Sequence, residues 1–367
     1  MERTGVVAVR RGEEMMVPEA EFRSYYGQPI IKSPIWHEPH MPLYLYLGGT
    51  SGAASVISAV ATLTGRDRLA LTARVTAAAG AAAGAGFLVA ELGRPERFLN
   101  MLRVFKPTSP MSVGSWLLAA HSGLTTLAAV SAVAVPHGPG ITGFPPARIM
   151  ASSAVRAART VPVPHAKIAV ALPCWIARIA RIARILPAAG DAAALAAVLT
   201  GPLMSTYTAV LVADTAVPAW HEAHRELPFL FAGSALASAG AVAMLATPRR
   251  EAGPARAAAV LGAAVETVAG AVMEHRLGLV GESYRLGRSG RLMRTARALT
   301  VGGALLATVA GRGRALGALS GLALTAGALC TRFGVLAAGR ASAADPKYTV
   351  VPQRERLEAA KAPELGA

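Results

Sequence analysis

The sequence predicts an all-α integral membrane protein with eight transmembrane helices arranged as two four-helix bundles. Of its 367 residues, 53% are hydrophobic and only 16% are charged, and the mean hydropathy is +0.43. A soluble domain of this size needs more polar surface than this composition supplies. The pattern Trp-His-Glu-x-His also occurs twice, at 36–40 and 220–224, each time shortly before an apolar run. This repeat predicts two related halves.

The apolar runs have the length of spanning helices, because a helix rising about 1.5 Å per residue needs about 20 residues to cross about 30 Å of hydrocarbon. Four runs contain no Asp, Glu, Lys or Arg: 42–65, 107–136, 192–213 and 227–248. Four weaker runs complete the prediction: 69–91, 255–273, 297–311 and 315–338. The expected organisation is an N-terminal segment, two bundles and a polar tail, at 1–41, 42–213, 214–338 and 339–367.

Glycine and alanine, rather than leucine, dominate the predicted helices, as in "GGTSGAAS" and "AAAGAAAGAG". Small residues let helix backbones approach closely within lipid, where packing drives helix association. Gly48 and Gly52 lie four residues apart on one helix face, and so do Gly80 and Gly84. We therefore expect close helix contacts at these positions.

The repeat and the charge distribution together predict the topology. An even number of helices in each half places both Trp-His-Glu-x-His segments on the same membrane face. Glu91 and Glu274 end the second helix of each half, which supports parallel repeats. Lys and Arg are more numerous on the side of the termini, so the positive-inside rule predicts cytoplasmic termini in the cell membrane.

The net charge of +16 fits this topology and contact with anionic lipid. Nucleic-acid binding is not expected, because no basic and aromatic module is present.

Two polar segments lie outside the predicted spans. The basic insertion at 136–190 contains "PCWIARIARIARILP", in which Ile and Arg repeat every three residues. Over three repeats this pattern stays on one side of a helix, so it predicts a helix lying at the lipid headgroups. The tail at 339–367 is polar and is expected to become ordered only on binding a partner.

Metal and haem sites are not predicted in this chain. The pattern HExH lacks the HExxH spacing of zinc proteases. Cys174 and Cys330 are far apart in the sequence and cannot hold an iron–sulfur cluster by themselves. A haem held by two histidines needs paired ligands within helices, and only His121 lies well inside a predicted span.

Ionisable residues at membrane depth are costly and usually mark a ligand or proton path. The candidates for a proton path are Glu91, His121 and Glu266. Glu91 has a second interpretation, in which it and Arg94 cap the second helix and bind the following loop. For Arg74 and Asp214 we favour a helix cap or a side chain extended to the headgroups.

Three stretches carry a resemblance to a known family. They are "PLYLYLGGTSGA", then "ELGRPERFLNMLRVFKPTSPMSVGSW" at 91–116, then "YTAVLVADTAVPAWHEAHRELPFLFAGSALASAGA" at 207–241. They resemble the NrfD/PsrC family, the membrane subunit of polysulfide reductase and related molybdopterin oxidoreductases. The middle stretch is the most specific. The resemblance covers about 36–135 and 200–340 and leaves out the basic insertion.

The resemblance implies two four-helix bundles without haem or metal. We assign no catalytic residues, and the chain is expected to be either a non-catalytic or a quinone-reactive subunit of an oxidoreductase complex. Such subunits exchange electrons between menaquinone, or another quinone, and a four-cluster iron–sulfur subunit. That subunit serves a molybdopterin catalytic subunit with molybdenum or tungsten.

By position, the resemblance implies the quinone-binding residues His37, His40, Tyr207 and Thr208. The loop at 93–111 is the candidate partner face, with Arg94, Arg97, Arg103 and Lys106. A histidine or a tyrosine hydroxyl suits a quinone carbonyl, which needs a hydrogen-bond donor that can be reprotonated. The family's asparagine ahead of the first helix is absent, which leaves one headgroup contact unassigned.

Two other functions remain open from the sequence. Parallel repeats with buried carboxylates also describe secondary transporters. Gly201 and Pro202 provide a helix break in the fourth span, but the eighth span has no corresponding break. The third possibility is a structural anchor that tethers a catalytic complex to lipid without a working quinone site. The terminal substrate of the complex is not determined by this chain.

Overall fold

The structure is a computed structural model that describes residues 29–92, 94–134 and 174–361. All regular elements in these ranges are helices. The long ones are α1 (His40–Leu63), α2 (Asp67–Glu91), α3 (Pro110–Ala134), α5 (Cys174–Ala213), α7 (Leu227–Ala246), α8 (Gly253–Arg276), α10 (Gly287–Val309) and α11 (Arg314–Ala344). The shorter ones are η1 (Pro95–Leu102), α6 (Pro218–Glu222), α9 (Glu282–Arg285), η2 (Ala310–Arg312) and α12 (Lys347–Lys361).

In the described part of the chain, seven helices are long and apolar enough to cross a membrane, so the chain is a membrane protein. They are α1, α2, α3, the Ile185–Ala213 part of α5, α7, α8 and α11. The expected span at 297–311 lies in α10, which is not one of the seven. The reason is the first half of α10, "GRSGRLMRTAR", where arginine recurs every three residues and lowers the hydropathy. An eighth span is therefore not confirmed.

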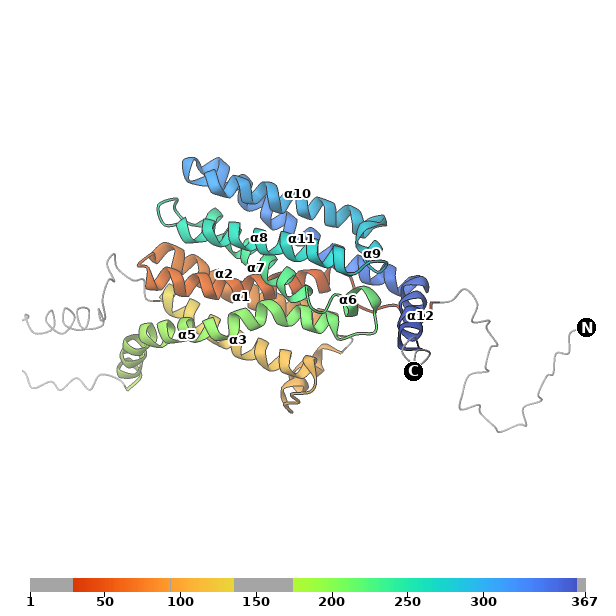
Figure 1. Ribbon diagram of the computed structural model, residues 1–367. Helices are drawn as coiled ribbons and strands as arrows, with labels where there is room; N and C mark the ends of the chain where they lie inside the picture. Colours follow the sequence, from red (N-terminus) through yellow and green to blue (C-terminus); the bar gives the residue numbers. More distant parts are fainter. Residues whose placement is uncertain (1–28, 93, 135–173, 362–367) are drawn as a thin grey trace, which may run out of the picture.

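The long helices lie side by side, with α10 and α3 on opposite flanks (Figure 1). We call the end at which α1 begins and α11 ends the entry end, and the other the opposite end. Helix α1 occupies the middle and packs against α2, α5, α7 and α11. In the later part of the chain, α8 contacts α7 and α10, and α11 contacts α7 and α10. Helix α1 thus contacts helices from both the earlier and the later part of the chain.

Glycines bring the helix backbones into direct contact, which confirms the expectation from composition. A Cβ atom on Gly52 of α1 would lie 2.3 Å from the carbonyl oxygen of Gly201 on α5. A Cβ atom on Gly233 of α7 would lie 2.5 Å from the backbone nitrogen of Glu266 on α8. No side chain fits between backbones at these separations, so the helix packing depends on the missing Cβ atoms.

Arg74 is buried between two helices and pairs with a partly exposed carboxylate, so the interpretation of a side chain extended to the headgroups was wrong. Its guanidinium lies 2.8 Å from the Asp191 carboxylate on α5 and 3.1 Å from the Thr62 hydroxyl. The Arg74 side chain is only 4% exposed. The side chain points inward because a carboxylate on the neighbouring helix offsets the cost of taking its charge out of water.

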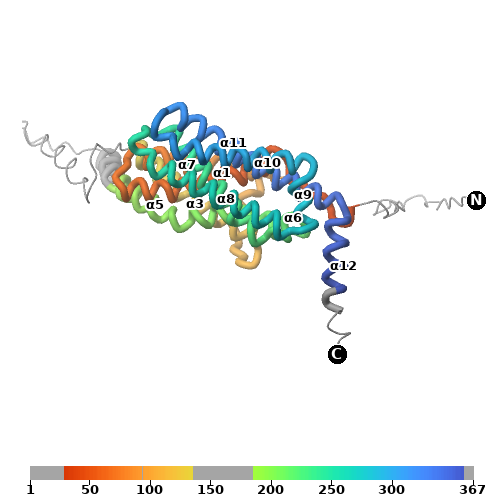
Figure 2. Tube along the Cα trace, turned by 45° about the horizontal axis from the view of Figure 1, so that its top comes forward, coloured from red at the N-terminus to blue at the C-terminus, as the bar shows by residue number. Residues whose placement is uncertain are grey.

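Both polar segments contain helix: the basic insertion as the sequence predicted, and the tail although it was expected to become ordered only on binding a partner. The arginine and isoleucine repeat forms the start of α5, and the side chains of 174–184 lie outside the described residues. In the expected tail, α11 continues to Ala344 and α12 follows, turned away from the long helices (Figure 2). Tyr348 is buried, and Lys347 lies 3.0 Å from the Glu282 carboxylate. The first turn of α12 is therefore attached to the rest of the chain.

We expect Gly52→Ala to destabilise the protein by about 1–3 kcal/mol, because the added methyl group overpacks the contact between α1 and α5. Thermal unfolding of the purified protein in detergent measures this change. Gly123→Ala is the matched control, since a Cβ atom there meets nothing within 4 Å. It should leave stability unchanged or raise it slightly. Equal melting temperatures of the two variants would contradict the packing argument.

Candidate functional site

The two Trp-His-Glu-x-His segments meet at the entry end. The rings of Trp36 and Trp220 stack with their centroids 5.1 Å apart and an interplanar angle of 21°. Trp220 is 1% exposed, and its indole N–H donates to the Val335 carbonyl at 2.8 Å. Gly339 of α11 makes room for that ring, because a Cβ atom there would lie 1.9 Å from it. The second segment thus provides a fixed aromatic surface for the first.

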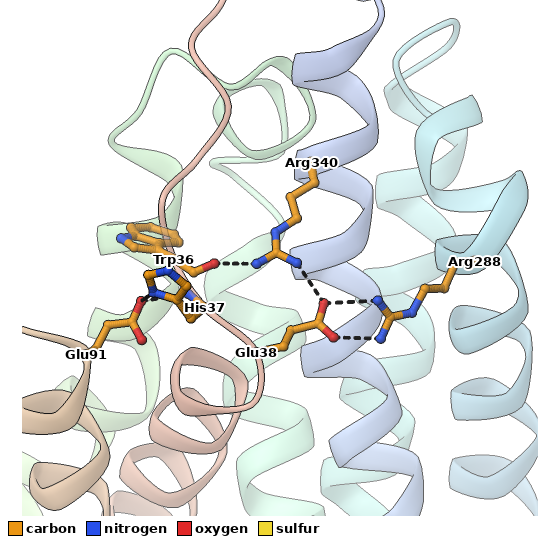
Figure 3. A network of polar contacts seen from close by, with 6 residues as sticks. All are labelled: Trp36, His37, Glu38, Glu91, Arg288 and Arg340. Atoms are coloured by element: carbon orange, nitrogen blue, oxygen red, sulfur yellow. Dashed lines mark hydrogen bonds and ion pairs between the residues drawn. The ribbon is translucent and has the colours of Figure 1, made fainter.

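Glu38 attaches the first segment to helices near the other end of the chain (Figure 3). Its carboxylate binds Arg288 of α10 at 2.6 Å and Arg340 of α11 at 3.1 Å. Arg340 also donates to the Trp36 carbonyl. Two arginines on one carboxylate, together with the tryptophan stack, hold the chain in place just before α1 begins.

His37 and His40 lie on either side of the Glu91 carboxylate (Figure 3 shows His37 and Glu91). The backbone N–H of His37 donates to Oε1 of Glu91 at 2.7 Å, and Nδ1 of His37 lies 3.2 Å from the same oxygen. Nδ1 of His40 lies 3.6 Å from Oε2. The exposed fractions of the three side chains are 74% for His37, 40% for His40 and 11% for Glu91. We call these three residues the histidine–glutamate cluster.

The cluster joins three residues that the sequence analysis singled out for two separate roles. Glu91 is the last residue of α2, and its described partners are the two histidines rather than Arg94. A carboxylate is unfavourable at the C-terminal end of a helix, where the backbone dipole is negative. The two imidazoles and the His37 backbone N–H therefore stabilise the negative charge of the Glu91 carboxylate, which the helix end disfavours.

Tyr207 and Thr208 are adjacent on α5 but lie in different surroundings. Tyr207 is partly buried, and its ring packs on Gly114 of α3, where a Cβ atom would lie 1.7 Å from it. Thr208 is fully buried, and its hydroxyl has no hydrogen-bond partner among the described residues. Successive helical residues point about 100° apart, which explains the difference. No hydrogen bond joins Tyr207 to His37 or His40 in the described part of the chain.

His121 is held inside the helices by hydroxyl groups. Nε2 lies 3.0 Å from the Ser51 hydroxyl, and Nδ1 lies 2.9 Å from the Thr200 hydroxyl. Ser51 donates to the Ala77 carbonyl and Thr200 donates to the Ala197 carbonyl, so either hydroxyl oxygen can accept from the imidazole. His121 thus links α1, α3 and α5 through its two ring nitrogens.

Glu266 lies in a separate buried group formed by α8, α10 and α11. Thr331 donates to its carboxylate at 2.6 Å and Thr300 at 3.4 Å. The three candidates for a proton path therefore sit in three places, and no hydrogen bond in the described ranges joins Glu91, His121 and Glu266 to one another.

Arg332 is a buried charge that the sequence analysis missed. It is 1% exposed, its Nη2 donates to the Phe231 carbonyl at 3.0 Å, and its guanidinium lies 3.7 Å from the centre of the Phe231 ring. Its Nε and Nη1 have no hydrogen-bond partner among the described residues. The sequence signal that could have found it is an arginine inside the apolar run 315–338. Arg332 directly follows Thr331, which binds Glu266.

The second segment makes different contacts from the first. Glu222 binds Arg356 of α12 at 2.7 Å, and Nδ1 of His224 lies 2.9 Å from the His221 carbonyl. Glu274, which matches Glu91 in position, binds Arg297 at 2.6 Å. The described residues therefore place histidines against the carboxylate in the first half only.

The loop after α2 is exposed at the entry end. Its four predicted docking residues, Arg94, Arg97, Arg103 and Lys106, are all exposed. Exposed apolar side chains lie among them, namely Leu99, Val104 and Phe105. Within the described ranges, no three His, Cys, Asp or Glu side chains gather closely enough to hold a metal ion.

We expect Glu38→Gln to loosen the chain ahead of α1, because the amide loses the charge that binds both arginines. Backbone hydrogen exchange over 36–41 should accelerate by about fivefold or more, corresponding to about 1 kcal/mol of lost local stability. Glu222→Gln is the matched change in the second segment and should leave exchange over 36–41 unaltered. Equal exchange in Glu38→Gln and the unmodified protein would show that the ion pairs do not hold this segment.

A comparison with protein families matches residues 30–280 to the family described as "Polysulphide reductase, NrfD". No individually curated protein matches the chain. The matched range covers more than half of the chain and includes both Trp-His-Glu-x-His segments, the histidine–glutamate cluster and the loop after α2. The predicted resemblance is thus confirmed, and the chain belongs to the NrfD family.

Proposed function

We propose that this chain is the quinone-interacting membrane subunit of a respiratory oxidoreductase complex. It exchanges electrons between menaquinone, or another quinone, and a four-cluster iron–sulfur subunit that serves a molybdopterin catalytic subunit with molybdenum or tungsten. The observation that carries the proposal is the histidine–glutamate cluster at the entry end, close in sequence to the exposed basic loop after α2.

The cluster has the polar groups that a quinone headgroup requires. Oε2 of Glu91 is buried and makes no hydrogen bond within the described residues, so it can accept a proton or a ligand donor. His40 is partly exposed, and its ring centroid lies 6.1 Å from that of Phe87. An imidazole donor beside an aromatic ring suits a flat headgroup with carbonyl oxygens. A bound quinone supplies a redox couple that takes up two electrons and two protons.

The graded exposure of the cluster suits proton transfer. His37 is the most exposed member and exchanges protons with water. Glu91 is nearly buried and lies within reach of both imidazoles, so it passes a proton from His37 to His40. His40 then presents the proton to a bound headgroup. Imidazole and carboxylate side chains are common general acids and bases in proteins.

Tyr207 is the second proposed hydrogen-bond donor. It lies two turns before the end of α5 at the entry end, so it is a short distance deeper in the membrane than the start of α1. Its ring lies on Gly114 and is partly buried. We keep Thr208 as a candidate from the resemblance, although its full burial gives a direct contact no support.

The entry end is the proposed docking face for the iron–sulfur subunit, and we place it in the cytoplasm. Exposed Arg and Lys side chains interleaved with Leu99, Val104 and Phe105 give the mixed charged and apolar surface of a protein interface. We also propose that α1, α2, α3 and α5 form one four-helix bundle and that α7, α8, α10 and α11 form the other. Their packing partners support this division.

Glu266 and His121 remain proposed members of a proton path. Glu266 lies in the proposed second bundle and accepts from Thr331, whose neighbour Arg332 has two nitrogens without a hydrogen-bond partner among the described residues. A secondary transporter would place its site at such a group, whereas an anchor would leave the histidine–glutamate cluster without function. Purification distinguishes the three: a transporter is isolated alone, and an anchor is isolated with its partner subunits but without quinone.

We expect Tyr207→Phe to weaken quinone affinity by about fivefold, since one hydrogen bond in such a site contributes about 1 kcal/mol. His40→Ala should have at least the same effect. His224→Ala, the matching change in the second segment, should have none. Quinone affinity is measured in the purified complex for the three variants. Negligible effects of all three would exclude this quinone site, and a selective loss in His224→Ala would move it to the second segment.

We expect Glu91→Gln to slow quinone-linked electron transfer by about tenfold or more, because the amide keeps the shape but cannot carry the proton. Assembly with the partner subunits should stay normal. Glu274→Gln is the control, since Glu274 binds an arginine and no histidine. Turnover is measured across the pH range in which carboxylates and histidines titrate. A profile that matches the unmodified complex would remove Glu91 from proton transfer.

A further inference from the structure

A cavity lined by arginines lies at the opposite end of the helices. It has a volume of about 310 Å³ and lies between the turn that joins α7 to α8 and the turn that joins α10 to α11. Four of its lining residues are arginines: Arg249, Arg250, Arg256 and Arg314. The described residues that line it include no Asp or Glu. Four like charges around one cavity repel one another, and an anion bound between them would offset this repulsion.

The one carboxylate in the turn after α7 points elsewhere. Glu251 accepts the backbone N–H groups of Arg68 and Leu69 at 2.9 and 3.3 Å, and so it caps the start of α2. The arginines themselves are positioned by backbone contacts. Arg256 donates to the Arg249 carbonyl at 3.4 Å, and Arg249 donates to the Arg312 carbonyl at 3.3 Å.

Two further features of the cavity favour an anion. The long helices α8 and α11 both begin at its wall, and neither has a side-chain cap on its first N–H groups. Helix N-termini carry a partial positive charge and donate to anions. Thr247 also lines the cavity, is 6% exposed, and its hydroxyl has no hydrogen-bond partner among the described residues. A buried hydroxyl without a partner indicates a missing acceptor.

We propose that this cavity binds a phosphate group, supplied within the membrane by the headgroup of an anionic phospholipid. Guanidinium groups bind phosphate with paired, charge-assisted hydrogen bonds. The cavity lies where α7 and α10 end and α8 and α11 begin, which is the level of the headgroups for helices that span the bilayer. Leu245, Leu305 and Leu319 are exposed on the neighbouring turns of these helices and face the region of the acyl chains. The proposal is independent of the quinone site at the entry end.

The test uses the full chain purified in neutral detergent. Binding of phosphatidylglycerol and of phosphatidylcholine is titrated by native mass spectrometry, and a separate thermal-shift series uses inorganic phosphate. The variants are Arg256→Gln with Arg314→Gln, and Thr247→Val alone, which keeps every charge. The control is Arg291→Gln with Arg354→Gln, which removes the same charge from exposed positions on α10 and α12.

We expect the unmodified chain to prefer phosphatidylglycerol, and we expect the double change in the cavity to weaken that binding by about tenfold or more. Thr247→Val should weaken it by about fivefold, and the control should not change it. If inorganic phosphate stabilises the chain with the same dependence on these residues and the lipid does not bind, the phosphate site stands with a free anion as its source. Binding that is equal in all variants, or absent for both ligands, would overturn the proposal.

Discussion

The stack of Trp36 on Trp220 is the contact on which the entry end depends. It joins the two copies of a five-residue pattern that lie far apart in the chain. The indole N–H of Trp220 donates to the Val335 carbonyl, and its ring packs against Gly339, which has no side chain. Trp220 therefore forms a rigid support for Trp36. Without that support, Trp36 and the residues after it would have few apolar contacts, because they precede α1 and lie near the surface. The position of His37 beside Glu91 therefore follows from a contact with the second half of the molecule.

The two copies of the pattern have become physically different. The first copy provides the histidines that face a carboxylate, and its Glu38 is held by two arginines from α10 and α11. The second copy provides the buried tryptophan and the short helix α6. The second copy thus supports the first, which carries the two histidines beside Glu91. A site built in this way contains residues from both halves, although its polar groups come from the first.

Inside the helices, the side chains of His121 and Glu266 are hydrogen-bonded to hydroxyl groups. His121 lies between Ser51 and Thr200, and Glu266 accepts from Thr331. Serine and threonine have small side chains, so they supply a hydrogen-bond donor without separating helix backbones that touch at glycine residues. Arg332 departs from this pattern because two of its nitrogens have no partner among the described residues. Buried charge of this kind is costly and marks the region around Glu266 as chemically distinct.

The sequence by itself determined the membrane class, seven of the expected spans and the close packing at glycine. It also predicted that the start of α1, with His37 and His40, and the end of α2, with Glu91, lie on one membrane face, whereas the contact between these residues came from the tertiary structure. Tertiary structure alone decided that Trp36 meets Trp220, that Arg340 binds Glu38, and that Arg74 turns inward to Asp191. Hydropathy and periodicity predict whether a segment forms a helix and whether that helix lies in lipid or in water. These contacts depend instead on which distant helices become neighbours. Which helices become neighbours depends on how well their whole surfaces fit together, and the sequence of a single segment does not contain that information.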